Sequence, residues 1–321
     1  MSEKNVDTEH LRTSDAGIEE QDRRRRGAYY TPKLWVDHAH KLITNTLGDD
    51  WREKYVVVDP ACGTKNLTRD YEFSELYSMT IDQDELDSSS DLNPEGTSFQ
   101  YDFLNDDVFA MHGQPAPKLS GGKSEKSKLA NIQRAIDWIN SKPHPGDIMR
   151  MSDNGELKMD AGLLKALREQ KPIVILSNPP YKSSRDGKTG GKSTTGITKT
   201  AMGQMMDGYD MAKQNMYTQF LYRYMLLAND FGYLNDFHLF TFSPVGHFTS
   251  PSFEKFRNKF YDTFSFDRDA SFIMHSKEFG LSGEFPIGFT HNEVKPDRFI
   301  GGMRPMGSTK LEDLPLSVDL D

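Results

Sequence analysis

Apolar residues along the chain follow two different spacings, and these predict strands that alternate with helices. The runs 55–58 and 172–176 are apolar throughout, which is typical of strands in a parallel sheet that is covered on both faces. Further strands are expected within 73–82, 99–103, 237–242, 271–274 and 285–290. The alternation of such runs with helical stretches predicts a doubly wound α/β sheet.

The helices are predicted from apolar positions that recur every three or four residues. One helix is expected to start at Thr31 and Pro32, with Thr31 as the N-cap and Pro32 in the first helical position. Two more are expected over 129–141 and 161–170. The segment from Tyr217 to Ala228 has apolar residues at i, i+3, i+4, i+7 and i+8, so an amphipathic helix is expected there.

Polar stretches divide the chain into segments. Residues 1–26 are rich in charged and hydroxyl residues and are expected to be a disordered leader, so the ordered domain is expected over 27–298. Within that domain, 111–170 is expected to be an insertion with loops and two helices, and 182–200, rich in Gly, Ser, Thr and Lys, a mobile loop. Residues 299–321 are expected to be a tail too short to form a further domain.

Composition narrows the function classes. The chain has 321 residues, a formal net charge of −9 and a single cysteine, so an intrachain disulfide and a multi-cysteine zinc site are excluded. No metal site is expected, since His38 and His40 have no ligand cluster near them in the sequence. No membrane span or signal peptide is visible, and a cytoplasmic protein without a membrane partner is expected.

The motif with the clearest chemistry is Ser177-Asn178-Pro179-Pro180-Tyr181, directly after the apolar run 172–176. The prolines fix the backbone and remove N–H donors, so the turn presents carbonyl oxygens beside the amide oxygen of Asn178. These oxygens suit both hydrogens of a planar NH₂ group, and the ring of Tyr181 offers a stacking surface. Catalytic roles on an amino or amide nitrogen are therefore expected for Asn178, Pro179, Pro180 and Tyr181, whereas a plain solvent loop is the alternative.

A second group of residues follows the earlier strands. The turn Asp59-Pro60-Ala61-Cys62-Gly63-Thr64-Lys65-Asn66 comes after the first strand, where doubly wound sheets bind nucleotide-like ligands. Asp82 ends the second strand and suits a ribose diol, with Asp84 and Glu85 close enough to take that role. Asp102 is placed to accept from an adenine amino group while Phe103 packs against the ring.

Two basic segments could contact a phosphate backbone despite the acidic net charge. Residues 23–26 are four consecutive arginines. The second segment adjoins the Asn-Pro-Pro-Tyr motif, and its candidate DNA-binding residues are Lys182, Arg185, Lys188 and Lys192. A solvated run of charge is the alternative for each.

The order of these motifs resembles the gamma class of amino-DNA methyltransferases, in particular the adenine-modifying enzymes of type I and type IIG restriction-modification systems. The resemblance spans roughly residues 27 to 294. It implies a Rossmann-like, seven-stranded mixed sheet, S-adenosylmethionine as cofactor, and methyl transfer to the exocyclic amino group of an adenine flipped out of double-stranded DNA. It further implies that Tyr181 stacks on the base while Asn178 and the Pro179 carbonyl hold its amino group.

The same resemblance assigns the cofactor site. The segment 27–32 would close over the methionine part of the cofactor, and the turn after the first strand would hold its amino acid end, with Asp59 near the ammonium. The cofactor-binding residues implied are Tyr29, Tyr30, Thr31, Pro32, Asp59, Ala61, Gly63, Asn66, Asp82, Asp102 and Phe103.

Two departures from the family pattern leave alternatives open. Lys65 stands where family members commonly have a second glycine, and its side chain would either crowd the methionine pocket or pair with the cofactor carboxylate. No target-recognition domain is visible after residue 298, so DNA recognition would fall to the 111–170 insertion, to a specificity subunit, or to a missing C-terminal domain. A noncatalytic or weakened subunit of a modification complex is one alternative, and a protein glutamine methyltransferase is another. The recognised DNA sequence, the oligomeric state and any accompanying nuclease do not follow from the sequence.

Overall fold

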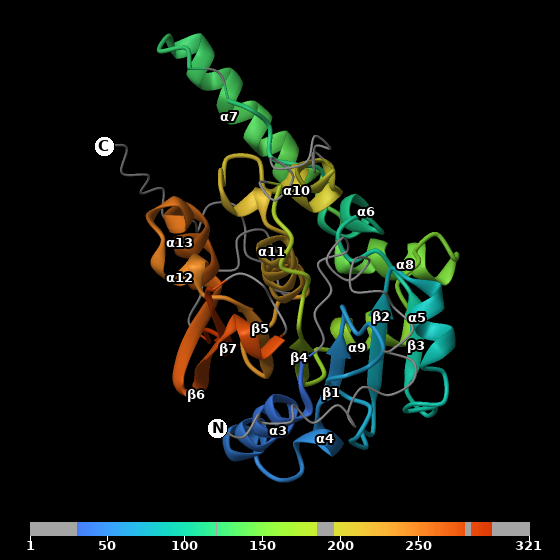
Figure 1. Ribbon diagram of the computed structural model, residues 1–321. Helices are drawn as coiled ribbons and strands as arrows, with labels where there is room; N and C mark the ends of the chain where they lie inside the picture. The colour runs from blue at the N-terminus through green and yellow to red at the C-terminus, as the bar shows by residue number, and fades with distance from the viewer. Residues whose placement is uncertain (1–30, 120, 185–195, 280–283, 297–321) are drawn as a thin grey trace.

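Seven strands form one mixed sheet in the order β3-β2-β1-β4-β5-β7-β6 (Figure 1). In the computed structural model, which describes residues 31–119, 121–184, 196–279 and 284–296, β7 runs antiparallel to both β5 and β6 and the other pairs are parallel. The expected doubly wound α/β sheet of seven strands is therefore confirmed. The strands are β1 (Val56–Asp59), β2 (Leu76–Thr80), β3 (Thr97–Gln100), β4 (Ile173–Ser177), β5 (Phe237–Pro244), β6 (Phe264–His275) and β7 (Pro286–Val294).

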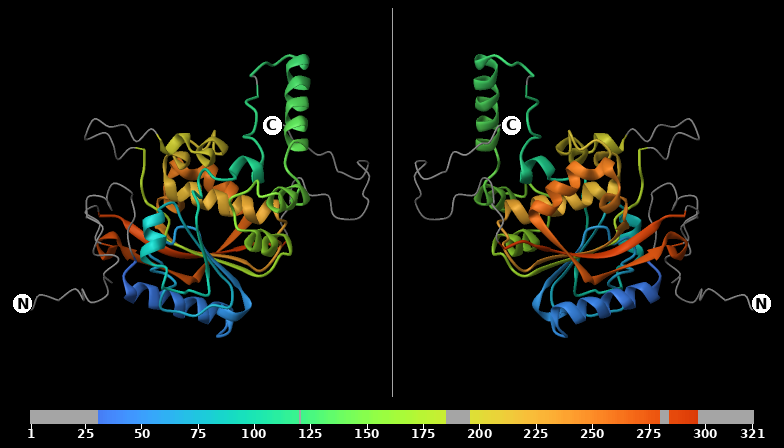
Figure 2. Two further views of the ribbon diagram at one scale, coloured as in Figure 1. Left: turned by 90° about the vertical axis from the view of Figure 1, so that its right-hand side faces the viewer. Right: turned by 90° about the vertical axis from the view of Figure 1, so that its left-hand side faces the viewer.

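The helices connect these strands and cover the sheet. Figure 2 shows α3, in blue, on one side of the sheet and α11 and α13, in yellow and orange, on the other. The helices are α3 (Lys33–Leu47), α4 (Trp51–Lys54), α5 (Gln83–Ser88), α6 (Val108–His112), α7 (Glu125–Asn140), α8 (Pro145–Asp153), α9 (Ala161–Arg168), α10 (Ala201–Met205), α11 (Met216–Asp230), α12 (Gly246–Thr249) and α13 (Glu254–Thr263). Short 3-10 turns lie at η2 (Ile197–Lys199), η3 (Ala212–Gln214), η4 (Pro251–Phe253) and η5 (Ser276–Phe279).

The central strands β1 and β4 are the ones predicted from continuous rather than alternating apolar residues. Every residue of both strands is buried, and Val57 pairs with Val174 in the parallel register. A strand that is covered by helices on both faces has no solvent-exposed side, so apolar residues occupy every position and do not alternate with polar ones. The strand order reverses between β1 and β4, and these are the two strands that the continuous apolar runs predicted.

Two expectations about the helices were wrong. Helix α3 begins at Lys33 with Pro32 in the N-cap position and without a side-chain cap. Thr31 does not cap it, because its hydroxyl accepts a hydrogen bond from the side chain of Asn178 instead. Helix α11 is not amphipathic: it is buried on all sides, and its polar side chains Gln219 and Arg223 are fully buried.

Candidate functional site

A cavity of about 180 Å³ lies at the carboxyl edge of the sheet, where the strand order reverses between β1 and β4. Ligands of doubly wound sheets bind at this position because the connections leave the sheet in opposite directions there and open a crevice. Its wall is formed by the loops that follow β1, β2, β3 and β4, by the segment that precedes α3, and by the first turns of α11. The lining residues are Thr31, Pro60, Ala61, Cys62, Gly63, Asn66, Leu67, Thr80, Ile81, Asp82, Glu85, Tyr101, Asp102, Phe103, Leu104, Asn178, Pro180, Met216 and Phe220.

The loop after β1 forms one wall through a tight turn. Cys62 donates its backbone N–H to the Met79 carbonyl of the neighbouring strand at 2.8 Å, which fixes the loop against β2. Gly63 has a φ of 51°, in the left-handed region that glycine adopts without a steric penalty. Its lack of a Cβ therefore permits the turn, and the residue lines the cavity.

Lys65 takes the same left-handed backbone, with a φ of 59°, although it carries a side chain. A non-glycine residue in this region costs on the order of 1–2 kcal/mol. The side chain is 2% exposed, and its Nζ donates to the Leu92 carbonyl oxygen at 2.6 Å. Lys65 does not line the cavity. The lysine thus fills a glycine-like backbone position without crowding the site.

Two buried oxygen atoms beside this loop have no hydrogen-bond partner among the described residues. One is Oδ2 of Asp59, whose Oδ1 accepts from the Ala61 backbone N–H at 3.2 Å. The other is Oδ1 of Asn66, in the cavity wall. Burial raises the pKa of the Asp59 carboxyl to about 8. Buried acceptors without donors are costly, so the Asn66 oxygen, in the cavity wall, suits a ligand that brings an N–H group. Asp59 does not line the cavity, so its Oδ2 does not face such a ligand.

Acidic side chains after β2 form a second part of the site. Asp82 caps helix α5, since its Oδ1 accepts from the Asp84 backbone N–H at 3.0 Å. Glu85 is buried, and its Oε2 accepts from the Thr80 hydroxyl at 2.7 Å. Asp82, Glu85 and Thr80 all line the cavity, so carboxylate oxygens are available for a diol, whereas Asp84 does not line it.

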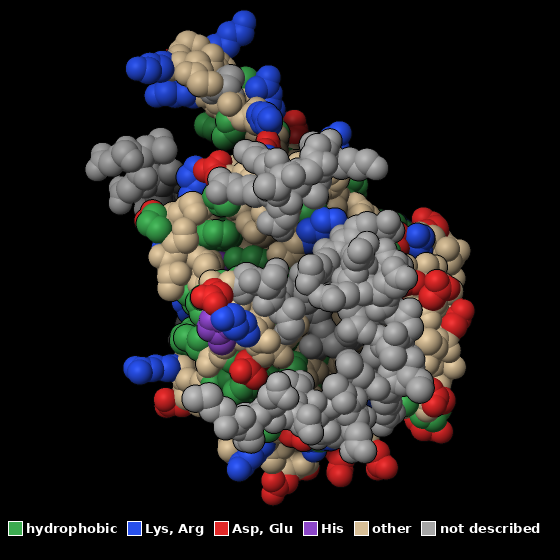
Figure 3. All heavy atoms as spheres, in the orientation of Figure 1, with side chains coloured by type: hydrophobic (Ala, Val, Ile, Leu, Met, Phe, Trp, Pro, Cys, Tyr) green, Lys and Arg blue, Asp and Glu red, His purple; other side chains and the backbone are tan. Residues whose placement is uncertain are grey.

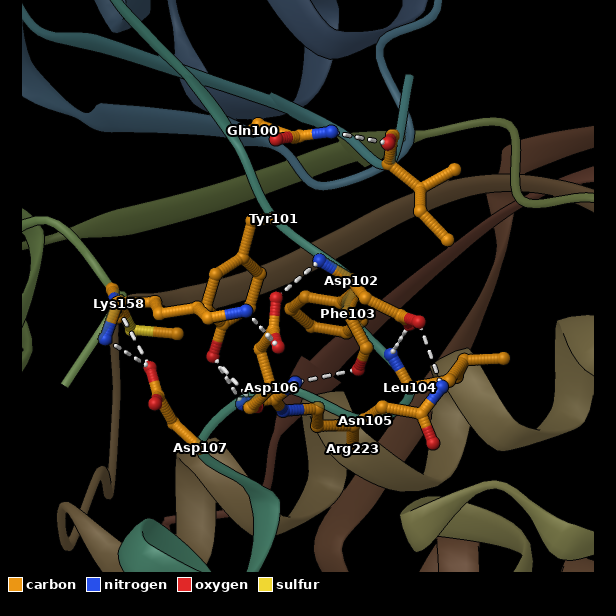
Figure 4. A network of polar contacts seen from close by, with 12 residues as sticks. Gln100, Tyr101, Asp102, Phe103, Leu104, Asn105, Asp106, Asp107, Lys158 and Arg223 are labelled. Carbon is orange, nitrogen blue, oxygen red and sulfur yellow. Dashed lines mark hydrogen bonds and ion pairs between the residues drawn. The ribbon is translucent and has the colours of Figure 1, made fainter. Parts of the chain in front are cut away.

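The turn after β3 is held from below by a buried arginine (Figure 4). Arg223 Nη1 donates to the Phe103 carbonyl at 2.5 Å, and its Nη2 donates to the Tyr101 hydroxyl at 2.7 Å. Asp102 accepts from the Leu104 backbone N–H at 3.0 Å and from the Asn105 amide at 2.7 Å. These bonds fix the position of the Asp102 carboxylate at the cavity wall.

Two stacked aromatic rings lie in the cavity wall beside Asp102. Phe103 stacks on Phe220 of α11, with ring centroids 5.1 Å apart and an interplanar angle of 22°. Both rings line the cavity. The combination of a carboxylate with flat apolar surfaces suits a purine ring that carries an amino group.

The Asn178 side chain is oriented by a hydrogen bond at each end. Its Nδ2 donates to the Thr31 hydroxyl at 3.0 Å, and its Oδ1 accepts from the Tyr181 hydroxyl at 2.6 Å. Asn178 and Pro180 line the same cavity as Gly63, so loops 115 positions apart in the sequence meet there.

Other predicted site residues lie outside the cavity wall. Pro179 and Tyr181 are buried, and Tyr181 packs edge to face against Phe279 at 6.3 Å between ring centroids. Burial raises the pKa of the Tyr181 hydroxyl well above its ordinary value. Pro32 and Asp59 do not line the cavity either. Lys182 is half-buried beside the motif, and its carbonyl accepts from the Met216 backbone N–H at 2.9 Å.

Several predicted residues fall outside the part of the chain that the structure describes. They are the arginines 23–26 and the site residues Tyr29, Tyr30, Arg185, Lys188 and Lys192. The expected leader and tail lie there as well.

Sequence reasoning missed some of the cavity wall. Leu104, Met216 and Phe220 were not identified as site residues. Met216 and Phe220 are four residues apart on α11, so their spacing places them on one helix face, but nothing in the pattern separates a cavity face from a core face. Leu104 follows Phe103 directly, and its proximity to that motif was the available signal.

A histidine cluster lies elsewhere in the sheet. Ligand atoms of His238, His291 and Glu293 all lie within 4.8 Å of one another. His238 Nδ1 is 3.0 Å from His291 Nε2, and His291 Nδ1 is 3.0 Å from Asp267 Oδ2. This chain of contacts connects β5, β7 and β6, which accounts for the polar side chains within the buried layer.

Comparisons with known proteins give likenesses at the level of the fold. No protein-family model and no curated protein matches the chain. Among solved structures, it is similar to the DrdV–DNA complex with a TM-score of 0.46 and 14% identity, covering 88% of this chain and 28% of the other. A putative class I S-adenosylmethionine-dependent methyltransferase from Listeria monocytogenes gives 0.45 and 13%, covering 89% and 65%. A modification subunit of a putative type I restriction enzyme from Vibrio vulnificus YJ016 gives 0.41 and 14%, covering 85% and 46%.

These values limit what the likenesses mean for this chain. It spans less than two thirds of the length of each of these three chains, and the TM-scores are below 0.5. These likenesses therefore do not identify a substrate or a partner of this protein. No helix in the described part of the chain has the length and apolarity needed to cross a bilayer.

Proposed function

We propose that this protein transfers a methyl group from S-adenosylmethionine to the exocyclic amino group of adenine in double-stranded DNA. The supporting observation is that one cavity is lined both by the loop after β1, with Gly63 and Asn66, and by Asn178 and Pro180 after β4. The proposed cofactor site and the proposed amino-group site thus share one cavity.

The residues present fit S-adenosylmethionine. Asp82 and Glu85 offer carboxylates to a ribose diol, and Asp102 with Phe103 suits an adenine ring. The unpartnered Oδ1 of Asn66, in the cavity wall, suits an N–H group of the amino acid end. The bound cofactor supplies an electrophilic methyl carbon.

The chain itself contributes positioning and hydrogen bonding. Asn178 Oδ1 and the Pro179 carbonyl accept the hydrogens of the target amino group, which directs its lone pair toward the cavity. Hydrogen bonds to Thr31 and Tyr181 hold the Asn178 amide in place at the cavity wall. Because the amino nitrogen is a neutral nucleophile, catalysis needs positioning and electrostatics rather than a covalent intermediate.

The cavity wall contains Asn178 and Pro180 but neither Pro179 nor Tyr181, so the turn has to shift before the Pro179 carbonyl meets the target amino group. Stacking of Tyr181 on a flipped base therefore requires its ring to turn out of its contact with Phe279. The energy of flipping, a few kcal/mol, is offset by stacking and hydrogen bonds in the pocket. We propose that Lys182, with Arg185, Lys188 and Lys192, contacts the DNA backbone beside that pocket.

Expression in a host that lacks DNA methylation, followed by sequencing for modified adenines, tests the proposal. Methylated adenines are expected with the wild-type chain and with Asn140→Ala, an exposed asparagine at the end of α7, and are expected to be absent with Asn178→Ala. Transfer in vitro to a glutamine-containing release factor and not to duplex DNA would support the glutamine methyltransferase instead. Absence of transfer with normal cofactor binding would support a noncatalytic subunit.

A further inference from the structure

Helix α7 projects from the body of the protein, as Figures 1 and 2 show in green. It has 16 residues, and none of them is buried. At 1.5 Å per residue the helix extends about 24 Å. Its base is attached by Trp138, whose Nε1 donates to the Gln114 carbonyl at 2.7 Å. The helix therefore has surface on nearly every side.

One side of this projecting helix is apolar. Leu129, Ile132, Ile136 and Ile139 are 62%, 55%, 44% and 50% exposed. Their spacing of three, four and three residues matches the a and d positions of a coiled-coil heptad, so they form one continuous stripe. A contiguous stripe of large aliphatic side chains on a protruding helix is unfavourable in water unless another surface covers it. We call these four residues the α7 stripe.

The residues that flank the stripe carry positive charge and no carboxylate. With Leu129 and Ile136 at a, Lys126 falls at position e and Lys128 at position g. The remaining e and g positions hold uncharged residues, namely Gln133, Ala135 and Asn140. Of the two carboxylates of the helix, Asp137 is at b, and Glu125, in the first turn, is at d, at the N-terminal end of the stripe. Figure 3 shows Lys and Arg side chains gathered along this arm.

These charges discriminate between candidate occupants of the stripe. A second copy of α7 would bring Lys126 and Lys128 against the same lysines in a parallel pair and against uncharged residues in an antiparallel pair, so neither arrangement supplies carboxylates for them. DNA phosphates would pair with the lysines but would leave four aliphatic side chains uncovered. A helix with apolar residues at a and d and with Glu or Asp at e and g would cover the α7 stripe and also place carboxylates beside the lysines.

We infer that the α7 stripe docks an amphipathic helix of another protein, one that has Glu or Asp on both sides of its apolar seam. The interaction goes beyond methyl transfer and does not depend on it, because α7 contributes no residue to the cavity. Docking would place a partner chain on the 111–170 segment of this protein.

A designed peptide with the chemistry expected of the partner helix tests the inference. The probe is a three-heptad helix with Leu and Ile at a and d and Glu at e and g, titrated into the full chain by fluorescence anisotropy. The matched control peptide has Lys at e and g. We expect the Glu peptide to bind at least about tenfold more tightly than the Lys peptide, a difference of about 1.4 kcal/mol.

Two variants locate the binding. Ile132→Glu combined with Ile136→Glu should weaken binding of the Glu peptide at least tenfold, whereas Ala130→Glu combined with Arg134→Glu, on the opposite face, should not. Circular dichroism verifies that both variants fold. Equal binding of the two peptides, or equal affinity in the stripe variant, would overturn the inference. So would a wild-type dimer in analytical ultracentrifugation that the stripe variant loses, because that result assigns the stripe to a second copy.

Discussion

The Tyr181 hydroxyl donates to Asn178 Oδ1 at 2.6 Å, and this bond ties the aromatic residue of the motif to the amide that faces the cavity. On the other end of the same amide, Thr31 accepts from Nδ2 at 3.0 Å. The motif residue expected to stack on a base thus also orients the expected acceptor.

Tyr181→Phe separates these two roles. The variant keeps the ring but removes the hydroxyl, so we expect kcat for methyl transfer to fall by about fivefold, the equivalent of a net hydrogen bond of about 1 kcal/mol. Tyr181→Ala should lower it by at least about 100-fold, because the stacking surface is lost as well. Steady-state kinetics with duplex DNA measures both. Tyr261→Phe is the control, since the buried Tyr261 hydroxyl has no partner among the described residues. An unchanged kcat in Tyr181→Phe would remove the hydroxyl from the mechanism.

Lys65→Gly tests whether the lysine obstructs the cofactor. The lysine side chain bonds to the Leu92 carbonyl and is absent from the cavity wall, so we expect the Kd for S-adenosylmethionine to stay within about threefold of the wild-type value. Isothermal titration calorimetry measures this value. A wild-type chain that fails to bind, and a glycine variant that binds, would show that the lysine blocks the site.

Asn66→Leu tests the unpartnered amide oxygen in the cavity wall. Removing a buried acceptor without a donor should not lower the melting temperature, whereas the Kd for the cofactor should rise about tenfold, since a hydrogen bond to a charged group contributes about 1.5–3 kcal/mol. Asn292→Leu is the matched control: Asn292 Oδ1 is also buried without a partner, but it lies on β7. A rise in Kd in both variants, or in neither, would contradict a cofactor contact at Asn66.

Stability should depend on pH through buried histidines. Burial lowers the pKa of His40 and His238 to about 3 and that of His247 to about 4, from 6.5. The folded state therefore binds fewer protons than the unfolded state, and stability is fully present above about pH 6.5 and is lost as the pH falls toward 4. The raised pKa of Asp59 acts in the opposite direction, so the measurement is best made in an Asp59→Asn background.

In that background we expect the melting temperature at pH 5 to lie at least roughly 5 °C below that at pH 7.5. His238→Phe should reduce the difference. Differential scanning calorimetry gives the values. A melting temperature that is equal or higher at pH 5 would show that these histidines do not set the pH dependence.

The sequence located the strands that are buried on both faces, because continuous apolar runs are specific to that setting. The runs 55–58 and 172–176 match β1 and β4 to within one residue. Strand β6 was recognised only at its end. Its first half contains Asp267 and Asp269, and the register shifts between Asp267 and Phe272, which breaks the period-two pattern. Helix α8 was missed because only Ile148 is buried and the cap is a histidine.

The candidate site could be predicted where residues follow strands directly, since parallel strands bring their carboxyl ends to one edge. Gly63, Asp82, Asp102 and Asn178 all line the cavity for this reason. The direction of the Lys65 side chain and the burial of Tyr181 could not be predicted, because both depend on contacts with distant residues. Gln219 and Arg223 likewise become buried through hydrogen bonds to carbonyls that the helical pattern does not reveal.

The most direct test of the account compares wild-type and Asn178→Ala protein in one assay that measures both cofactor binding and transfer of labelled methyl groups to duplex DNA. We expect the wild-type chain to form N6-methyladenine and the variant to lose at least about 100-fold in rate, with a Kd for S-adenosylmethionine within about threefold of wild type. Equal transfer by the variant, or transfer by neither protein despite tight cofactor binding, would contradict this expectation.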